Sequence, residues 1–141
     1  MAGPGPRRQA REAALQVLFA ADVSQKVPSE AFDDVLSSFS LPNKARARAH
    51  ELVSGVSRNL AQIDAHIGAS SEHWKVSRLA TVDRNILRIA TYELLFEPVV
   101  PTEVILDEAI EIARRFAGET SRAFVNGVLD VIAREVRGAA A

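Results

Sequence analysis

Cysteine is absent from all 141 residues of the chain, which excludes disulfide bridges and thiol chemistry and suits a reducing cytoplasm. No apolar run is long enough to cross a membrane, and the N-terminus lacks the charged and then apolar segments of a secretion signal. The formal net charge is only −1, which by itself does not mark a nucleic-acid-binding protein. We therefore expect a cytoplasmic globular protein that binds no membrane.

Sequence motifs for catalysis are also missing. The seven glycines are scattered, and none has the spacing of a dinucleotide-binding or phosphate-binding loop. The three histidines have no metal-site spacing, and no serine or threonine occurs in a nucleophile elbow. Carboxylates are frequent, but no pair stands out for acid–base chemistry. These absences predict a binding protein that is not an enzyme and needs no cofactor or metal.

Helical periodicity is the strongest positive signal, and it centres on the stretch from Val82 to Phe96. At about 100° per residue, apolar side chains cover so much of this helix that it needs neighbours on more than one side. The predicted stripe consists of Leu79, Val82, Ile86, Ile89 and Ala90, widened by Leu87 and Leu94. Asp83 interrupts the apolar arc, while Arg84 and Arg88 share the polar face one turn apart.

The same periodicity predicts further helices on both sides, with no strand-like alternation anywhere. After a flexible arm at residues 1–6, helices begin near Arg7 and at a Ser29 cap, and one long helix follows Asn43 and reaches Ile67. Trp74 is predicted to fill the space between two helical layers, and Ser77 is predicted to cap the central helix. Two more helices follow, one between Pro101 and Gly118 and one from Thr120 or Ser121. We therefore expect a single all-α domain of six or seven helices.

A candidate nucleic-acid surface begins at the basic N-terminus. Arg7, Arg8 and Arg11 occur among the first eleven residues, which contain no acid. Arg8 and Arg11 share one flank of the first helix with Leu15 and Phe19, and this flank is either a binding surface or a solvated cluster beside core residues.

The last helix supplies the second part of that surface. Phe124 lies about 100° from its buried stripe, so the ring is either exposed or packed on a neighbouring helix. Ser121 and Asn126 offer hydrogen-bond donors near the helix start, where the helix dipole favours phosphate. Arginines for phosphate and an aromatic ring for base stacking are a common way to hold single-stranded RNA.

Four stretches of this chain resemble the NusB family of transcription antitermination factors, and together they cover nearly the whole sequence. They are the central signature at residues 78–94, the following helix at residues 101–113, the segment Phe124-Val125-Asn126-Gly127-Val128-Leu129-Asp130 and the arginine-rich start at residues 7–14. The resemblance is weakest between Val27 and His50. It implies an all-α fold of two small helical bundles without enzymatic activity.

The resemblance also implies partners and binding residues. Family members bind the single-stranded boxA element of nascent ribosomal RNA leaders with the ribosomal protein NusE, and help to build an antitermination complex on RNA polymerase. By this resemblance the RNA-binding residues are Arg7, Arg8, Arg11, Ser121, Phe124 and Asn126. The NusE-binding residues are Phe19, Asp83 and Arg84. Gln9 interrupts the arginine run, which favours RNA binding that depends on NusE.

Several alternatives stay open at this stage. A NusB-like domain is also an RNA-binding appendage of ribosomal RNA cytosine methyltransferases, and a helical bundle of this kind can serve protein interaction alone. Monomer and homodimer are both compatible with the sequence. Asp83 can be a partner of the helix dipole at the start of the central helix instead of a NusE contact.

Overall fold

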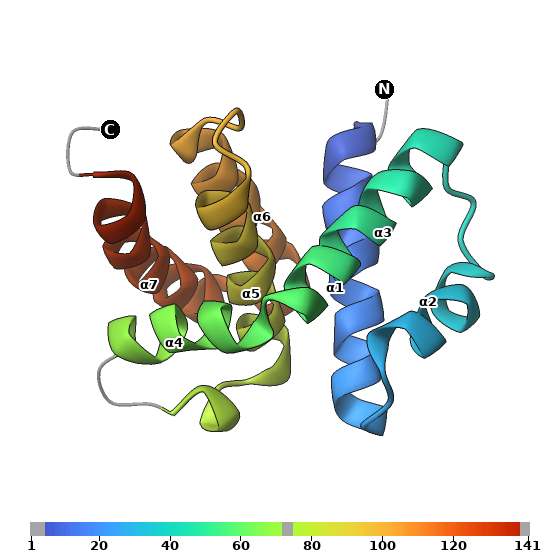
Figure 1. Cartoon of the computed structure of the whole chain (residues 1–141), viewed down its shortest axis with the longest axis horizontal. Helices are drawn as coiled ribbons and strands as arrows, with labels where there is room; N and C mark the ends of the chain where they lie inside the picture. Colours follow the sequence, from blue (N-terminus) through green and yellow to red (C-terminus); the bar gives the residue numbers. More distant parts are fainter. Residues whose placement is uncertain (1–4, 72–74, 139–141) are drawn as a thin grey trace. The chain divides into compact units, whose positions relative to one another are not determined.

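The structure is a computed structural model that describes residues 5–71 and 75–138. Over these residues it consists of α-helices and one short 3-10 helix, with no strand, which confirms the all-α prediction (Figure 1). The elements are α1 (Pro6–Ser24), α2 (Pro28–Leu36), α3 (Asn43–Arg58), α4 (Leu60–Ser70), η1 (Val76–Arg78), α5 (Thr81–Phe96), α6 (Thr102–Ala117) and α7 (Glu119–Arg137). They form two compact units, one up to Arg58 (unit 1) and one from Asn59 (unit 2).

Unit 1 is a bundle in which α1 packs against both α2 and α3. Its interface is rich in small side chains, and Ala10, Ala14 and Ala49 are fully buried. Alanine in a helix stripe allows two helix backbones to approach closely while Leu52 and Val17 fill the remaining space. The predicted stripe of the first helix is therefore confirmed as core.

Unit 2 is organised around α5, which packs against α4, α6 and α7. Its buried apolar side chains include Ile86, Leu87 and Leu94, which confirms the central role predicted for this helix. Val82, predicted in the buried stripe, is only half-buried, whereas the polar side chains of Asn85 and Thr91 are buried. The helical pattern assigns only apolar side chains to the core, so it does not predict the burial of Asn85 and Thr91.

The predicted long helix from Asn43 to Ile67 is wrong, because the chain breaks between α3 and α4. Asn59 has φ −119° and ψ 23°, which leaves the α-helical region, and Leu60 is 38% exposed although it belongs to the predicted stripe. The apolar periodicity continues on both sides of the break, so the pattern alone does not reveal it. The break coincides with the boundary between the two units.

The helix caps predicted at Ser29 and Ser77 are also wrong. Helix α2 begins at Pro28 after Val27, because proline fixes the φ angle that the first helical position needs. Ser77 lies inside η1, and α5 begins only after Ala80. Residues 1–4 of the predicted arm and Trp74 lie outside the described residues, and Pro6 is already the first residue of α1.

None of the helices over the described residues combines the length and the hydropathy that a membrane crossing would need.

Candidate nucleic-acid and partner interface

The start of α1 presents the three predicted arginines to different degrees. Arg7 is exposed and Arg8 half-buried, but only 7% of Arg11 is accessible. The first turn contains no acidic residue, and Gly5 accepts the first helical bond from the Gln9 N–H at 2.9 Å. Arg8 and Arg11 each make further interactions within the chain. Arg7 is consequently the arginine that this helix end offers most openly to a phosphate.

Phe19 lies two turns beyond Arg11 on the same helix. It is 38% exposed, whereas Leu15 between them is buried. An aromatic ring left this accessible on an otherwise well-packed helix is a typical anchor for a protein partner. The predicted flank therefore divides into a buried middle and an accessible aromatic end.

The start of α7 is fixed by a glycine that no other residue replaces easily. Gly118 has φ +98°, and its N–H donates to the carbonyls of Ala113 and Arg114 at 3.1 and 3.0 Å, which ends α6. Its own carbonyl accepts the N–H of Arg122 at 3.0 Å, which begins α7. The sharp turn starts α7 at Glu119, one residue before the predicted start.

The predicted RNA residues of α7 follow this turn. Ser121 and Phe124 are half-buried and Asn126 is exposed, while the neighbouring Val125 is fully buried. Phe124 thus keeps part of its ring accessible, between the two outcomes that the sequence allowed. The exposed ion pair of Glu119 with Arg122, at 2.7 Å, places a carboxylate in the first turn, which weakens this helix end as a phosphate site. The accessible part of the Phe124 ring is the feature of this segment on which a base could stack.

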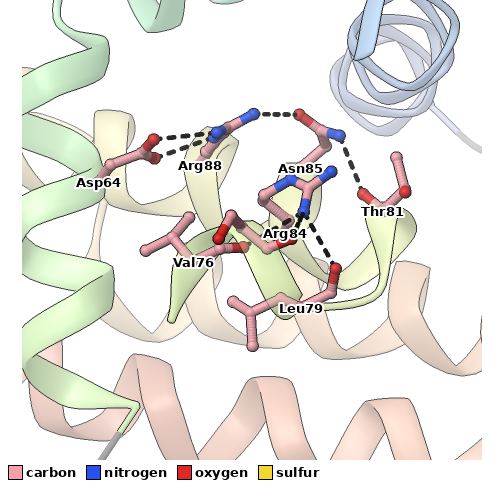
Figure 2. Close-up of polar contacts among 8 residues, drawn as sticks. Asp64, Val76, Leu79, Thr81, Arg84, Asn85 and Arg88 are labelled. Atoms are coloured by element: carbon pink, nitrogen blue, oxygen red, sulfur yellow. Dashed lines mark hydrogen bonds and ion pairs between the residues drawn. The ribbon is translucent and has the colours of Figure 1, made fainter. Parts of the chain in front are cut away.

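At the start of α5, Arg84 holds the preceding turn. Its Nη1 donates to the carbonyls of Val76, Ser77 and Leu79 at 3.2, 3.3 and 3.0 Å (Figure 2). These bonds fix η1 against the helix that follows it. Arg84 therefore has a structural role that its position on the polar face did not predict.

Asp83 occupies the third position of the same helix, where a carboxylate is favoured by the helix dipole. It is only 8% exposed, and none of the described residues donates a hydrogen bond to its buried Oδ1. A buried carboxylate oxygen without a donor is costly. Of the two accounts that the sequence left open for Asp83, its position and burial fit the dipole account directly.

Arg88 links α5 to α4 through a bidentate ion pair with Asp64. Its Nε and Nη2 donate to the two carboxylate oxygens at 2.9 Å each, and Nη1 donates to the Asn85 side chain at 3.3 Å (Figure 2). Asn85 donates in turn to the carbonyl of Thr81 at 2.9 Å. This network satisfies a polar side chain that would otherwise be buried without partners.

Arg137, in the last turn of α7, was missed by sequence reasoning. Its guanidinium donates five hydrogen bonds of 2.5–3.3 Å to the carbonyls of Glu93, Leu94, Glu97 and Val100 and to the Thr102 hydroxyl. These carbonyls include the end of α5, where helical carbonyls lack partners of their own. No local pattern identifies such a residue, because its acceptors are about 40 residues away along the chain.

The predicted site residues therefore lie on both units. Arg7, Arg8, Arg11 and Phe19 belong to α1 in unit 1, whereas Ser121, Phe124, Asn126, Asp83 and Arg84 belong to unit 2. Within the described ranges, no group of histidine and carboxylate side chains is arranged to hold a metal ion.

Comparison with known proteins identifies relatives along most of the chain. Residues 8–134 match the NusB family. The transcription antitermination protein NusB of Geobacter sp. (strain M21) is 44% identical, over 92% of this chain and 95% of the relative. Among solved structures, NusB of Thermotoga maritima has a TM-score of 0.85 at 43% identity, covering 96% of this chain and 94% of that one.

A third similar protein is seen with partners. It is the NusB of a crystal structure of the antitermination factors NusB and NusE in complex with double-stranded RNA. The TM-score is 0.84 at 30% identity, and the match covers 92% of this chain and 97% of that one. These relatives are antitermination proteins, which favours a transcription antitermination factor over an RNA-binding appendage of a ribosomal RNA methyltransferase.

Proposed function

The chain belongs to the NusB family, and from this premise we propose that it is a transcription antitermination factor that binds boxA-type RNA of nascent ribosomal RNA leaders together with NusE. The observation that carries the proposal is the near-complete match, in sequence to antitermination proteins and in fold to the NusB of an RNA complex that contains NusE. It acts by binding and not by catalysis, in the cytoplasm, as one component of a complex on RNA polymerase.

For the RNA surface we propose that the arginines of α1 contact phosphates and that Phe124 stacks on a base. The exposure of Arg7 and the partial exposure of Arg8 support this role, and Arg11 contributes least because little of it is accessible. Ser121 contributes a hydrogen bond on the side of the Phe124 ring, and Asn126, about 200° around α7 from Phe124, contributes one from the opposite flank.

For the NusE surface we propose Phe19, Asp83 and Arg84. Phe19 is the strongest of the three, because an exposed aromatic ring gains most from burial against a partner. Asp83 and Arg84 act at the start of α5, where Arg84 already fixes the local backbone. Because Asp83 is only 8% exposed and its Oδ1 is buried, a donor from NusE would meet only the small accessible part of this residue.

The test is a fluorescence anisotropy titration of a labelled boxA-type RNA with this protein, with and without NusE, over a salt series. We expect saturable binding that is tighter with NusE and that weakens as salt rises, because phosphate contacts release counterions. Unlabelled competitors, one a scrambled single strand and one a duplex of the boxA sequence, measure sequence and strand preference. Equal competition by boxA and scrambled RNA, with no effect of NusE, would contradict the proposal.

A further inference from the structure

Unit 1 has a cavity of about 280 Å³ between α1 and the segment that follows α2. One side is formed by α1, with Gln9, Glu12 and Gln16, and the other by Phe39 and Ser40. The cavity is open to solvent, and its volume lies just below the roughly 300–1,000 Å³ of pockets for drug-sized ligands, which leaves room for one small group. None of the RNA or NusE residues proposed above lines it.

The wall opposite α1 is held in place by short-range hydrogen bonds. The Phe39 N–H donates to the Leu36 carbonyl at 3.1 Å, and Leu36 is buried. The hydroxyls of Ser37 and Ser38 donate to the carbonyls of Asp34 and Val35 at 2.8 and 3.2 Å. These bonds tie the backbone before Phe39 to the end of α2.

The α1 side of the cavity is polar and regular. Gln9, Glu12 and Gln16 follow one another at helical spacing on one face, above the buried Ala13. The two carboxamides each offer donors and acceptors, and the carboxylate accepts. Glu12 has another interaction within the chain, but a carboxylate has about four acceptor positions and can receive a further hydrogen bond.

A polar row facing an aromatic ring is the arrangement that recognises a nucleobase, which has a polar edge and flat apolar faces. Arg8 lies about 100° around α1 from Gln9 and Arg7 about 200°, so a strand whose phosphates contact Arg8 can reach the cavity from that flank of the helix. Unit 1 is also the basic half of the chain, with eight lysines and arginines against six acidic residues.

We infer that this cavity holds one unstacked base of the bound RNA, with an amino group of the base donating to Glu12 and one face of the base on Phe39. The inference rests on the proposed RNA-binding function and deepens it by adding a base-reading site. A carboxylate only accepts hydrogen bonds, and guanine offers it two parallel donors, the N1–H and the amino group. Adenine and cytosine offer one amino group and uracil one N3–H, so the site favours guanine.

The experiment is a double-mutant cycle between protein and RNA. A boxA-type RNA is prepared with each nucleotide in turn made abasic, and its affinity is measured in the presence of NusE for the wild type and for Phe39→Ala and Gln16→Ala. Glu12→Gln is tested against RNAs that carry each base at the sensitive position. Gln62→Ala is the matched control, since Gln62 is an exposed glutamine of α4.

For the wild type, we expect one position of the RNA at which the abasic substitution lowers affinity roughly 5- to 150-fold, the range for one stacked base. In Phe39→Ala and Gln16→Ala the same abasic substitution should cause little further loss, while Gln62→Ala should behave as wild type. Glu12→Gln should reduce the preference for guanine without weakening overall folding, which a thermal melt checks.

Three results would overturn the inference. In the first, each abasic substitution lowers the affinity of the variants by the same factor as that of the wild type. RNA binding then stands, but without a base in this cavity. In the second, the variants leave RNA affinity unchanged and weaken NusE binding, so that the cavity is a protein contact. In the third, the wild type binds no RNA under any condition, and then the proposed function fails together with the inference.

Discussion

The two units of this chain differ in how many polar side chains they bury. Over the described residues, Arg11 is the one buried polar or charged side chain of unit 1, whereas unit 2 buries Ser70, Ser71, Asp83, Asn85, Thr91 and Glu93. Unit 1 carries eight basic and six acidic residues, and unit 2 carries nine and twelve. Unit 1 thus combines an apolar core with a basic charge balance, while unit 2 is acidic and held by polar networks as well as by packing.

This difference separates two kinds of mutational effect. A substitution in the networks of unit 2 leaves buried polar groups without partners, which costs stability. A substitution of an exposed arginine in unit 1 leaves the core intact, and on the proposed RNA surface it should remove a phosphate contact.

The largest loss of stability is expected for Arg137→Ala. Removing the guanidinium leaves several carbonyls at the end of α5 without their donor, and we expect a loss of about 3 kcal/mol in the free energy of unfolding. Urea unfolding followed by circular dichroism measures it. Arg134→Ala is the control, because its exposed pair with Asp130 is worth less than about 1 kcal/mol. Equal losses for the two variants would show that the five hydrogen bonds of Arg137 add no more to the free energy of unfolding than one exposed ion pair.

The second prediction compares an ion pair from each unit. Arg88 and Asp64 are 15% and 26% exposed, whereas Arg46 and Asp33 in unit 1 are 39% and 86% exposed. We expect Arg88→Ala to cost about 2 kcal/mol, and Arg46→Ala less than about 1 kcal/mol. Double-mutant cycles on each pair give the coupling energies, and a larger coupling in unit 1 would reverse the contrast.

The third prediction concerns RNA binding by unit 2. Phe124→Ala should weaken RNA binding by about 1–2 kcal/mol, in the lower part of the range for base stacking because the ring is partly buried in the chain. Phe96→Ala is the control, since Phe96 is also a partly exposed aromatic of unit 2. Anisotropy titration and thermal unfolding are measured for both variants. A drop in melting temperature with unchanged RNA affinity would assign Phe124 to the core.

The smallest effect is expected for single arginines of unit 1. Arg7→Ala should lower the slope of log affinity against log salt by about 0.7, the value for one phosphate contact on single-stranded RNA, without a change in unfolding free energy. Arg11→Ala should change the slope less, because Arg11 is 7% exposed. An unchanged slope for Arg7→Ala would remove the start of α1 from the RNA surface.

Much of the fold could be predicted from local sequence, because helix stripes are local patterns. Ile86, Leu87 and Leu94 are core residues as their spacing predicts. The break at Asn59 could not be predicted, since the apolar period continues across it. Of the site, the exposure of Phe19 and Arg7 is compatible with their predicted roles, whereas the roles of Arg84 and Arg137 depend on carbonyls that only the folded chain brings to them.

The central claim is that this protein promotes processive transcription through boxA RNA and NusE, and the most direct test is a purified transcription assay. The template carries a boxA leader ahead of a terminator, and RNA polymerase, NusE and the other components of the antitermination complex are held constant. We predict that adding this protein raises the fraction of transcripts that pass the terminator, and that scrambling boxA or omitting NusE abolishes the increase. Readthrough that is the same with and without the protein on the boxA template would contradict the account.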